Sequence, residues 1–247
     1  AITTMADAGC LVAWCGEQGI RFYAQGLGET RSSANLTRQA RLWADPEQRL
    51  RIVCKMYAMR FDEPIPEGST LRQIRGMEGA RVRAAYARAS RTYGVPWSGR
   101  EYDRRNWDHS DPINRALSAA NSCLYGVCQA AIVALGYSPA LGFIHSGKML
   151  SFVYDVADLY KIDLTIPVAF EETAKGAHQL ESRVRHRCRD MFAENHLLEM
   201  IVDDLEMLFD GVELPGEDLV DSDMALPGDL WDPGGNLPGG RNFGSDV

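Results

Sequence analysis

The sequence lacks the features of secreted and membrane-embedded proteins. No run approaches the roughly 18 to 20 apolar residues that span a bilayer, and no basic segment followed by an apolar stretch opens the chain as a secretory signal would. None of the six cysteines forms a C-x-x-C pair, which disfavours a zinc module. Cys123 and Cys128 lie within an apolar helical pattern, which is typical of small buried side chains rather than of a disulfide framework. These absences predict a protein of the reducing cytoplasm without a membrane partner. The chain also has no initiator Met, so we expect that its start was removed or that the sequence is a fragment.

Charge is distributed unevenly along the 247 residues. The net charge of −8 by itself disfavours a nucleic-acid partner, yet residues 31–115 hold seventeen Lys and Arg against ten Asp and Glu. Salt screens fields within about 10 Å, so the local balance decides which partner a surface attracts. The basic stretch therefore predicts either a phosphate-binding surface or an arginine-rich, solvated helical face.

The pattern of apolar residues changes from strand to helix and then to tail. Residues 11–15 form a short apolar run and residues 20–23 alternate as a strand does, which predicts a hairpin. One hairpin needs more sheet to be stable, so residues 1–28 are interpreted as the remnant and linker of an N-terminal β-domain. Residues 29–212 show helical periodicity and predict a mainly α fold. Residues 213–247 hold eight acids, one Arg and eleven Pro or Gly, which is typical of a tail.

Caps and breakers predict the individual helices. Asp45 and Pro46 are typical of a helix start, and so is Ser69 or Thr70. We expect Leu36, Ala40 and Trp43 to face the core from a first helix, and Leu50, Val53 and Met56 from a second. The predicted helices after a start at Ser32 or Ser33 cover residues 46–60, 70–93, 112–135 (central), 150–161, 165–175 and 178–210.

Asp155 and Asp158 are the acids most suggestive of chemistry. They stand at i and i+3 in an apolar helical segment, so their side chains are expected on one largely buried face. Buried carboxylates must be paired, protonated or bound to metal. The pair therefore predicts either a metal site or two acids at an exposed helix end.

Glu78 and His145 are further candidates for the same site. Glu78 lies between Gly76 and Gly79, and two helix-weakening glycines beside one acid suggest close approach by another backbone or by a ligand. His145 precedes the helix of the Asp pair. One carboxylate from each of two helices, together with the imidazole of His145, would suit Mg²⁺ or Mn²⁺, and the imidazole favours Mn²⁺. Arg75, Arg81 and Arg83 surround Glu78, either as a surface network or as part of the phosphate-binding stretch.

Four stretches resemble a known family: LRQIRGMEGARVRAAY, SAANSCLYGV, GYSPALGFIHSGKMLSFVYDVADLYK and VRHRCRDMF. With the LVAWCGEQGIRFYAQG hairpin, they resemble CRISPR-associated protein one, the integrase-nuclease of CRISPR adaptation, in its type I-E form. The resemblance runs from about residue 1 to about residue 210. It implies a C-terminal helical catalytic domain preceded by the last hairpin of the N-terminal β-domain.

The resemblance also implies roles for individual residues. Glu78, His145 and Asp158 match the family's metal ligands, and Asp155 matches a second acid needed for activity. The positions matching DNA-contacting or pocket residues are Arg21, Arg75, Tyr125, Lys148, Lys161 and Arg185. At Ser182 some relatives carry a basic residue, for which the neighbouring Arg183 is a possible substitute.

The implied activity is joining of short DNA fragments into a CRISPR array by attack of a 3′-hydroxyl on a phosphodiester. The implied partners are spacer-precursor and repeat DNA, a second copy of the chain, and a small partner subunit contacted by the acidic tail. Tyr102 and Trp107 are expected either to stack on splayed bases or to pack within their loop. Two alternatives are a metal-dependent nuclease without integration and a non-catalytic DNA-binding scaffold.

Overall fold

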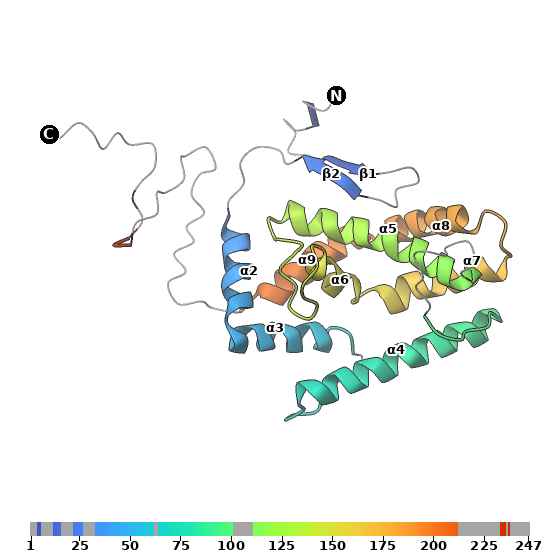
Figure 1. The fold of residues 1–247 in the computed structure, drawn as a ribbon, viewed down its shortest axis with the longest axis horizontal. Helices are drawn as coiled ribbons and strands as arrows, with labels where there is room; N and C mark the ends of the chain where they lie inside the picture. The colour runs from blue at the N-terminus through green and yellow to red at the C-terminus, as the bar shows by residue number, and fades with distance from the viewer. Residues whose placement is uncertain are drawn as a thin grey trace.

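A computed structural model gives the fold of the chain and describes residues 4–5, 12–15, 22–26, 33–61, 64–100, 111–211, 233–235 and 237. The expected mainly α class is confirmed, with a two-stranded hairpin before the helices (Figure 1). The domain boundaries at residues 28 and 212 stay predictions. The elements are β1 (Val12–Cys15), β2 (Phe22–Gly26), α2 (Ala34–Ala44), α3 (Pro46–Ala58), α4 (Leu71–Tyr93), α5 (Pro112–Ala134), α6 (Ser151–Ala157), η3 (Lys161–Thr165), α7 (Ile166–Ala174), α8 (Leu180–Glu194) and α9 (Leu197–Phe209).

The predicted hairpin is present, and its two strands are antiparallel. Val12 pairs with Gly26, and the register shifts by one residue between Trp14 and Cys15. Such a shift is typical of a β-bulge, which bends the strand locally.

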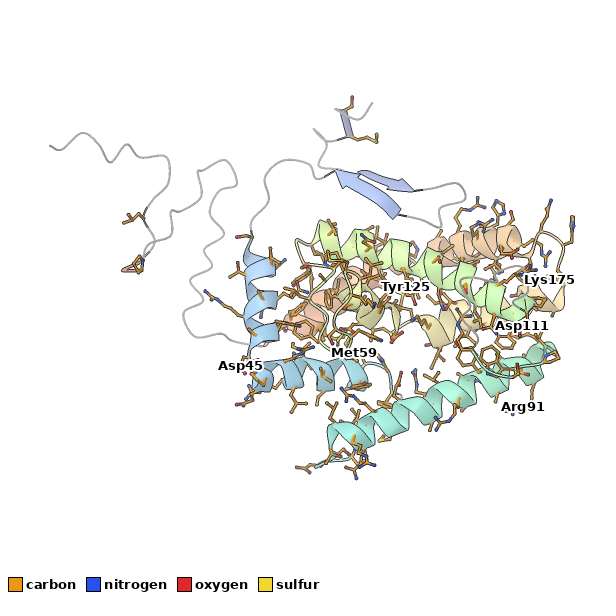
Figure 2. All side chains as sticks on the ribbon, viewed as in Figure 1. Asp45, Met59, Arg91, Asp111, Tyr125 and Lys175 are labelled. Carbon is orange, nitrogen blue, oxygen red and sulfur yellow. The ribbon has the colours of Figure 1, made fainter. Side chains whose placement is uncertain are left out.

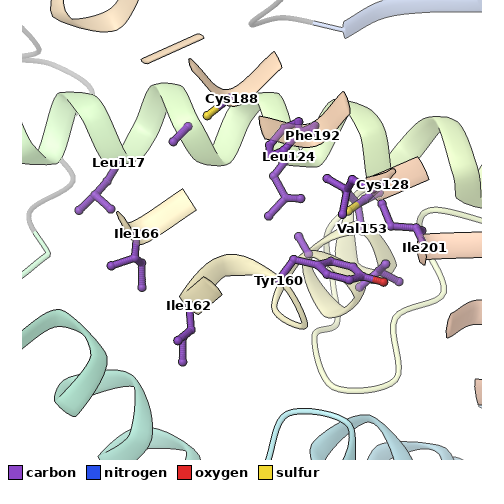
Figure 3. Packing of buried hydrophobic residues seen from close by; sticks show 14 of the residues in the cluster. Leu117, Leu124, Cys128, Val153, Tyr160, Ile162, Ile166, Cys188, Phe192 and Ile201 are labelled. Carbon is purple, nitrogen blue, oxygen red and sulfur yellow. The ribbon is translucent and has the colours of Figure 1, made fainter. Parts of the chain in front are cut away.

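Helix α5 forms the centre of the helical part and packs against α6, α7, α8 and α9 (Figure 1). Its apolar side chains are buried on several sides, as its alanine-rich composition predicts. Figure 3 shows Leu117, Leu124 and Cys128 of α5 among side chains of the surrounding segments, including Ile201 of α9 and Tyr160 from the turn after α6. Burial of this surface is the main favourable term in folding.

Among the described helices, α5 also has the length and composition to cross a membrane. The expectation that no segment approaches this limit missed it, because scattered polar residues interrupt the apolar run. Within the structure 56% of its most apolar window is buried against other helices. Its apolar character is therefore accounted for by its central place in the core.

Capping residues set the helix boundaries where the sequence predicts them. The Asp45 carboxylate accepts hydrogen bonds from the backbone N–H groups of Glu47 (2.8 Å) and Gln48 (3.1 Å) at the start of α3. Thr70 and Gln73 form a capping box at the start of α4. These contacts satisfy backbone donors that a helix start otherwise leaves unpaired.

Several expected details of the helices are wrong. Leu36 is 41% exposed rather than a core residue, because α2 turns Gln39 and Leu42 inward. Leu50 is 46% exposed, because the buried face of α3 includes Ile52 and Met56 instead. The polar Gln39 side chain is buried because it bonds the backbone of Ser138 and Leu141.

Two of the predicted long helices are broken. The helix expected over 150–161 ends at Ala157. A turn then leads the chain into the π-helical segment η3, which is followed directly by α7. The expected 178–210 helix divides into α8 and α9 at His196, which adopts a left-handed backbone with φ of 49°. Hydrophobic periodicity continues through both breaks, so the pattern alone does not locate them.

An ion-pair network joins α7 to α8 and predicts a pH dependence of stability. The Glu172 side chain is only 6% exposed, and it contacts Lys175 Nζ at 2.6 Å and Arg183 Nε at 3.1 Å. Burial alone would raise the pKa of this carboxyl, but the hydrogen bonds from Lys175 and Arg183 outweigh burial and hold the pKa below 4.5. A lowered folded-state pKa adds stability above the unfolded-state value, and this stability is lost as the pH falls through the folded-state value.

Glu172→Gln is therefore expected to lower the free energy of unfolding by about 2 kcal/mol at pH 7. The difference from the unmodified protein should shrink as the pH falls below 4.5. Urea unfolding at several pH values measures it. Glu171→Gln is the control, because the Glu171 side chain is 33% exposed and pairs with Lys175 alone in the described structure. A loss that does not vary with pH would contradict this account.

Candidate acid–histidine site beside an arginine-rich helix

The candidate site is built around the loop of residues 142–145, which is held from two sides. Trp43 Nε1 and Arg49 Nη2 donate to the carbonyl of Gly142 at 3.0 and 3.2 Å, and Arg49 Nε donates to that of Phe143 at 3.0 Å. Side chains of α2 and α3 thereby donate hydrogen bonds to the carbonyl groups of the loop. The backbone N–H groups of the loop instead donate to Asp155.

Asp155 of α6 is completely buried, and its carboxylate accepts hydrogen bonds from the backbone of this loop. The backbone N–H groups of Phe143 and Ile144 donate to Oδ2 at 2.6 and 3.0 Å, and that of His145 donates to Oδ1 at 2.8 Å. Asp158, three residues later, is the C-cap of α6 and keeps a helical backbone, but its carboxylate contacts Arg60 and Lys161 rather than this loop. Asp155 is placed to orient the loop rather than to bind a second ion.

The same carboxylate orients the ring of His145. His145 Nδ1 lies 2.7 Å from Asp155 Oδ1. Because a carboxylate accepts hydrogen bonds, Nδ1 carries the hydrogen and Nε2 remains as the ligand atom of the neutral ring. The hydrogen bond to Asp155 raises the pKa of His145 above 6.5, against the opposing effect of burial.

Glu78 and Asp158 meet at Arg60, a residue that the sequence analysis missed. Arg60 Nη1 lies 3.4 Å from Glu78 Oε1 and 3.8 Å from Asp158 Oδ2, and the Arg60 side chain is only 3% exposed. The two carboxylate oxygens therefore lie no farther apart than these two distances together. Arg60 follows Met59, labelled in Figure 2, at the end of α3 near α4. Glu78, from α4, thus meets Asp158, 80 positions later in the numbering, as the predicted site requires.

Lys161 and two tyrosines form the wall next to Asp158. Lys161 Nζ lies 2.6 Å from Asp158 Oδ1 and 4.9 Å from the centre of the Tyr125 ring. Tyr125 packs edge-on against Tyr154, whose ring in turn contacts the ring of His145. Burial would lower the pKa of Lys161, but Asp158 and Tyr125 outweigh burial and raise it. These side chains connect His145 to Asp158. After Arg60, Tyr154 is the second residue of the site that the sequence analysis missed.

The carboxylate oxygens and the imidazole nitrogen are of the type that binds a hard divalent ion, but their present positions do not form a complete coordination site. Within residues 33–61, 64–100 and 111–211, no three His, Cys, Asp or Glu side chains stand close enough to hold a metal ion. Glu78 Oε2 is nevertheless buried without a hydrogen-bond donor in the described structure; Arg81 lies beside it at 3.7 Å. A buried carboxylate oxygen without a donor is suited to a cation.

Helix α4 presents a basic surface around this site. It carries six arginines and a single acid, Glu78. Of the predicted residues, Arg75 and Arg83 are exposed, and Arg81 is held near Glu78. Lys148 is exposed in the loop before α6. The exposed arginines of α4 are Arg72, Arg75, Arg83, Arg88 and Arg91.

Arg185 lies on a different surface. It lines an open groove of about 530 Å³ between α5 and α8, together with Ser182, His186 and Arg189. Arg183 does not substitute for a basic residue at Ser182, because its guanidinium is bonded to Glu172 and to the carbonyl of Gly176. Arg189 lines the groove instead. The predictions for Arg21, Tyr102, Trp107 and most of the acidic tail lie outside the described residues.

The glycines beside Glu78 do not mark a close approach by another part of the described backbone. A Cβ on Gly76 would meet no atom within 4 Å, and one on Gly79 would meet only the end of the Arg83 side chain. The close approach occurs at Gly142, where a Cβ would lie 2.6 Å from the His145 carbonyl oxygen. The expectation for another backbone at residues 76–79 is therefore wrong.

Gly142→Ala is expected to destabilise the protein by at least about 2 kcal/mol, because the added methyl group overlaps with the backbone that presents His145. Gly76→Ala is the matched control, and it should raise stability by up to about 1 kcal/mol because alanine favours the helix. Thermal unfolding of both variants measures the difference. Equal stability of the two variants would rule out the crowded turn.

Comparisons with known proteins identify the family of the chain. The family model described as CRISPR associated protein Cas1 matches residues 57–187. CRISPR-associated endonuclease Cas1 2 of Thermus thermophilus is 57% identical over 247 residues, which covers all of this chain and 76% of the relative. CRISPR-associated endonuclease Cas1 of Escherichia coli K12 is 44% identical over 238 residues, which covers 95% of this chain and 78% of the relative.

Solved structures show the same fold. The crystal structure of a TtCas1–DNA complex has a TM-score of 0.78 and 58% identity, covering 86% of this chain and 79% of the other. A casposase bound to integration product has a TM-score of 0.57 at 15% identity, covering 90% of this chain and 79% of the other, which shows a shared fold alone. Fold and site define a helical protein with an acid–histidine cluster beside an arginine-rich helix. The chain belongs to the Cas1 family of CRISPR-associated proteins.

Proposed function

We propose that this chain is the metal-dependent DNA integrase of a type I-E CRISPR adaptation system, joining short DNA fragments into the array. The observation that carries the proposal is the meeting of Glu78 and Asp158 at one buried cation, Arg60, with Lys161 and the Asp155–His145 pair alongside. The relatives named as endonucleases and the solved TtCas1–DNA complex support a role on DNA.

Glu78, Asp158 and neutral His145 are the proposed ligands of one Mg²⁺ or Mn²⁺ ion. When bound, such an ion polarises a phosphoryl oxygen and offsets the charge that develops during transfer. Asp155 keeps His145 in the tautomer whose Nε2 has a free lone pair to bind an ion, and it fixes the backbone of the loop. Asp155 would thus influence a bound ion only by orienting His145.

The basic residues are proposed to hold the DNA. The exposed arginines of α4, including Arg75 and Arg83, would contact phosphates along the strand, while Lys161 and Lys148 would offset charge at the reacting phosphate. The fragment's 3′-hydroxyl oxygen attacks phosphorus, a new phosphodiester forms, and the array strand leaves as a free 3′-hydroxyl. Arg81 belongs to the same arginine-rich helix, and its guanidinium lies 3.7 Å from the Glu78 carboxylate.

The proposed assembly contains spacer-precursor DNA, repeat DNA, a second copy of this chain and a small partner subunit. The acidic tail, 213–247, is proposed to contact that subunit, and Arg21 and Arg185 to contact DNA. Because the substrate is the cell's own array, the proposed location is the cytoplasm.

A joining assay with the partner subunit, Mn²⁺ and a fragment ending in either a 3′-hydroxyl or a 3′-deoxy nucleotide tests the proposal. Joined product is expected with the hydroxyl end, and none with the deoxy end or after EDTA. Cleavage of DNA without joining would instead indicate a nuclease that does not integrate. Salt-dependent binding that EDTA does not alter, with no product, would indicate a scaffold.

A further inference from the structure

Arg60 occupies a position that the sequence does not single out. It follows α3, yet it contacts Glu78 of α4 and Asp158 at the end of α6. Its Nη2 also donates to the carbonyl oxygen of Asp155 at 3.2 Å, in a buried contact. One guanidinium therefore joins three segments at the point where the two acids meet.

Two carboxylates this close repel one another, and burial strengthens the repulsion. In the described structure the cations near Glu78 and Asp158 are Arg60, Arg81 and Lys161. Of the two acids, Arg81 contacts only Glu78 and Lys161 contacts only Asp158, so Arg60 is the described cation that both acids share. A divalent ion bound by both acids needs the same shared position.

We propose that Arg60 is a built-in counter-ion that holds Glu78 and Asp158 together in the metal-free protein and is displaced from them when a divalent ion binds. The inference rests on the proposed function for the identity of the ligands. Contacts with Glu78 and Asp158 are long, at 3.4 and 3.8 Å, so they are less costly to break than short bidentate pairs.

Arg60 keeps other partners when it yields the carboxylates. The Asp155 carbonyl oxygen accepts from Nη2, and the guanidinium lies 5.2 Å from the centre of the Tyr57 ring. A cation over an aromatic face is stabilised by the ring's charge distribution. The displaced side chain therefore remains a paired charge beside the ion, and together they leave the site more positive, which favours a DNA phosphate.

Displacement has a measurable consequence, since Arg60 and the ion compete. Arg60→Gln is expected to bind Mn²⁺ about tenfold more tightly than the unmodified protein, because the ion no longer displaces a cation. The Mn²⁺-induced rise in melting temperature should also be larger. Free Mn²⁺ measured by electron paramagnetic resonance, together with thermal unfolding of the full chain, gives both values. Arg51→Gln is the matched control, because it removes one positive charge from an exposed part of α3 and should leave Mn²⁺ affinity unchanged.

Arg60→Lys keeps the fold testable if Arg60→Gln does not fold. A single ammonium group spans two acids less well than a planar guanidinium, so Mn²⁺ should bind about threefold more tightly. Mn²⁺ affinity equal to or weaker than that of the unmodified protein in the folded variants would overturn the inference. Glu78→Gln distinguishes failure of the proposed metal site from failure of the counter-ion role. If this variant leaves Mn²⁺ binding intact, the proposed ligands are wrong. If it abolishes binding while Arg60→Gln gives no tightening, the counter-ion role alone fails.

Discussion

Asp155→Asn is expected to lower the free energy of unfolding by about 3 to 5 kcal/mol and to abolish DNA joining. The carboxylate accepts from three backbone N–H groups and the His145 ring, with no exposure to solvent. An asparagine side chain has one oxygen instead of two and turns an NH₂ group toward these donors. Several buried N–H groups would then lose their acceptor, at a cost for each.

The variant should also change the titration of His145. In the unmodified protein the hydrogen bond to Asp155 raises the pKa of His145, so the pair stabilises the fold below the unfolded-state pKa. That contribution is lost as the pH rises through the raised folded-state value. Removal of the carboxylate should therefore lower the pKa of His145, which nuclear magnetic resonance can follow in the folded fraction.

Urea unfolding of Asp155→Asn measures the stability, with Asp163→Asn as the control. Asp163 is an exposed acid nearby in the chain, and its amide variant should stay within about 0.5 kcal/mol of the unmodified protein. If both variants unfolded at the same urea concentration, the carboxylate of Asp155 would not hold the 142–145 loop.

Local sequence signals predicted the helices but not how the site is assembled. Asp45, Thr70 and Asp111 cap helices because their side chains bond backbone groups two or three residues away. Such contacts can be derived from neighbours in the chain. The inward face of α2 could not be derived in this way, because Gln39 is buried by hydrogen bonds to a segment about 100 positions away.

The same distinction separates the predicted from the missed site residues. Glu78, His145 and Asp158 were named from their residue types and local positions, and the quoted stretches that resemble a family assigned them as metal ligands. Arg60 is one of seventeen basic residues in the 31–115 stretch, and nothing around it in the sequence marks it. Its importance comes from the packing of three segments. Tyr154 was missed for the same reason, since an aromatic residue in an apolar helix predicts only core.

Glu78→Gln is expected to reduce Mn²⁺-dependent DNA joining by at least about a hundredfold while changing stability little. The amide preserves the size of the side chain, and its oxygen can still accept a hydrogen bond from Arg60, so the metal-free fold is retained. What disappears is the negative charge that a divalent ion requires. Asp158→Asn should have the same effect, since the two acids are proposed to bind one ion.

The joining assay and a DNA-binding assay measured together identify the cause of the loss. Glu78→Gln should bind DNA at least as well as the unmodified protein, because removal of a negative charge beside the arginines of α4 does not weaken attraction to phosphates. Glu47→Gln is the control for a carboxylate lost from an exposed helix surface, and it should join DNA normally. Normal joining by Glu78→Gln, with DNA binding intact, would show that the buried acid of α4 does not take part in the reaction.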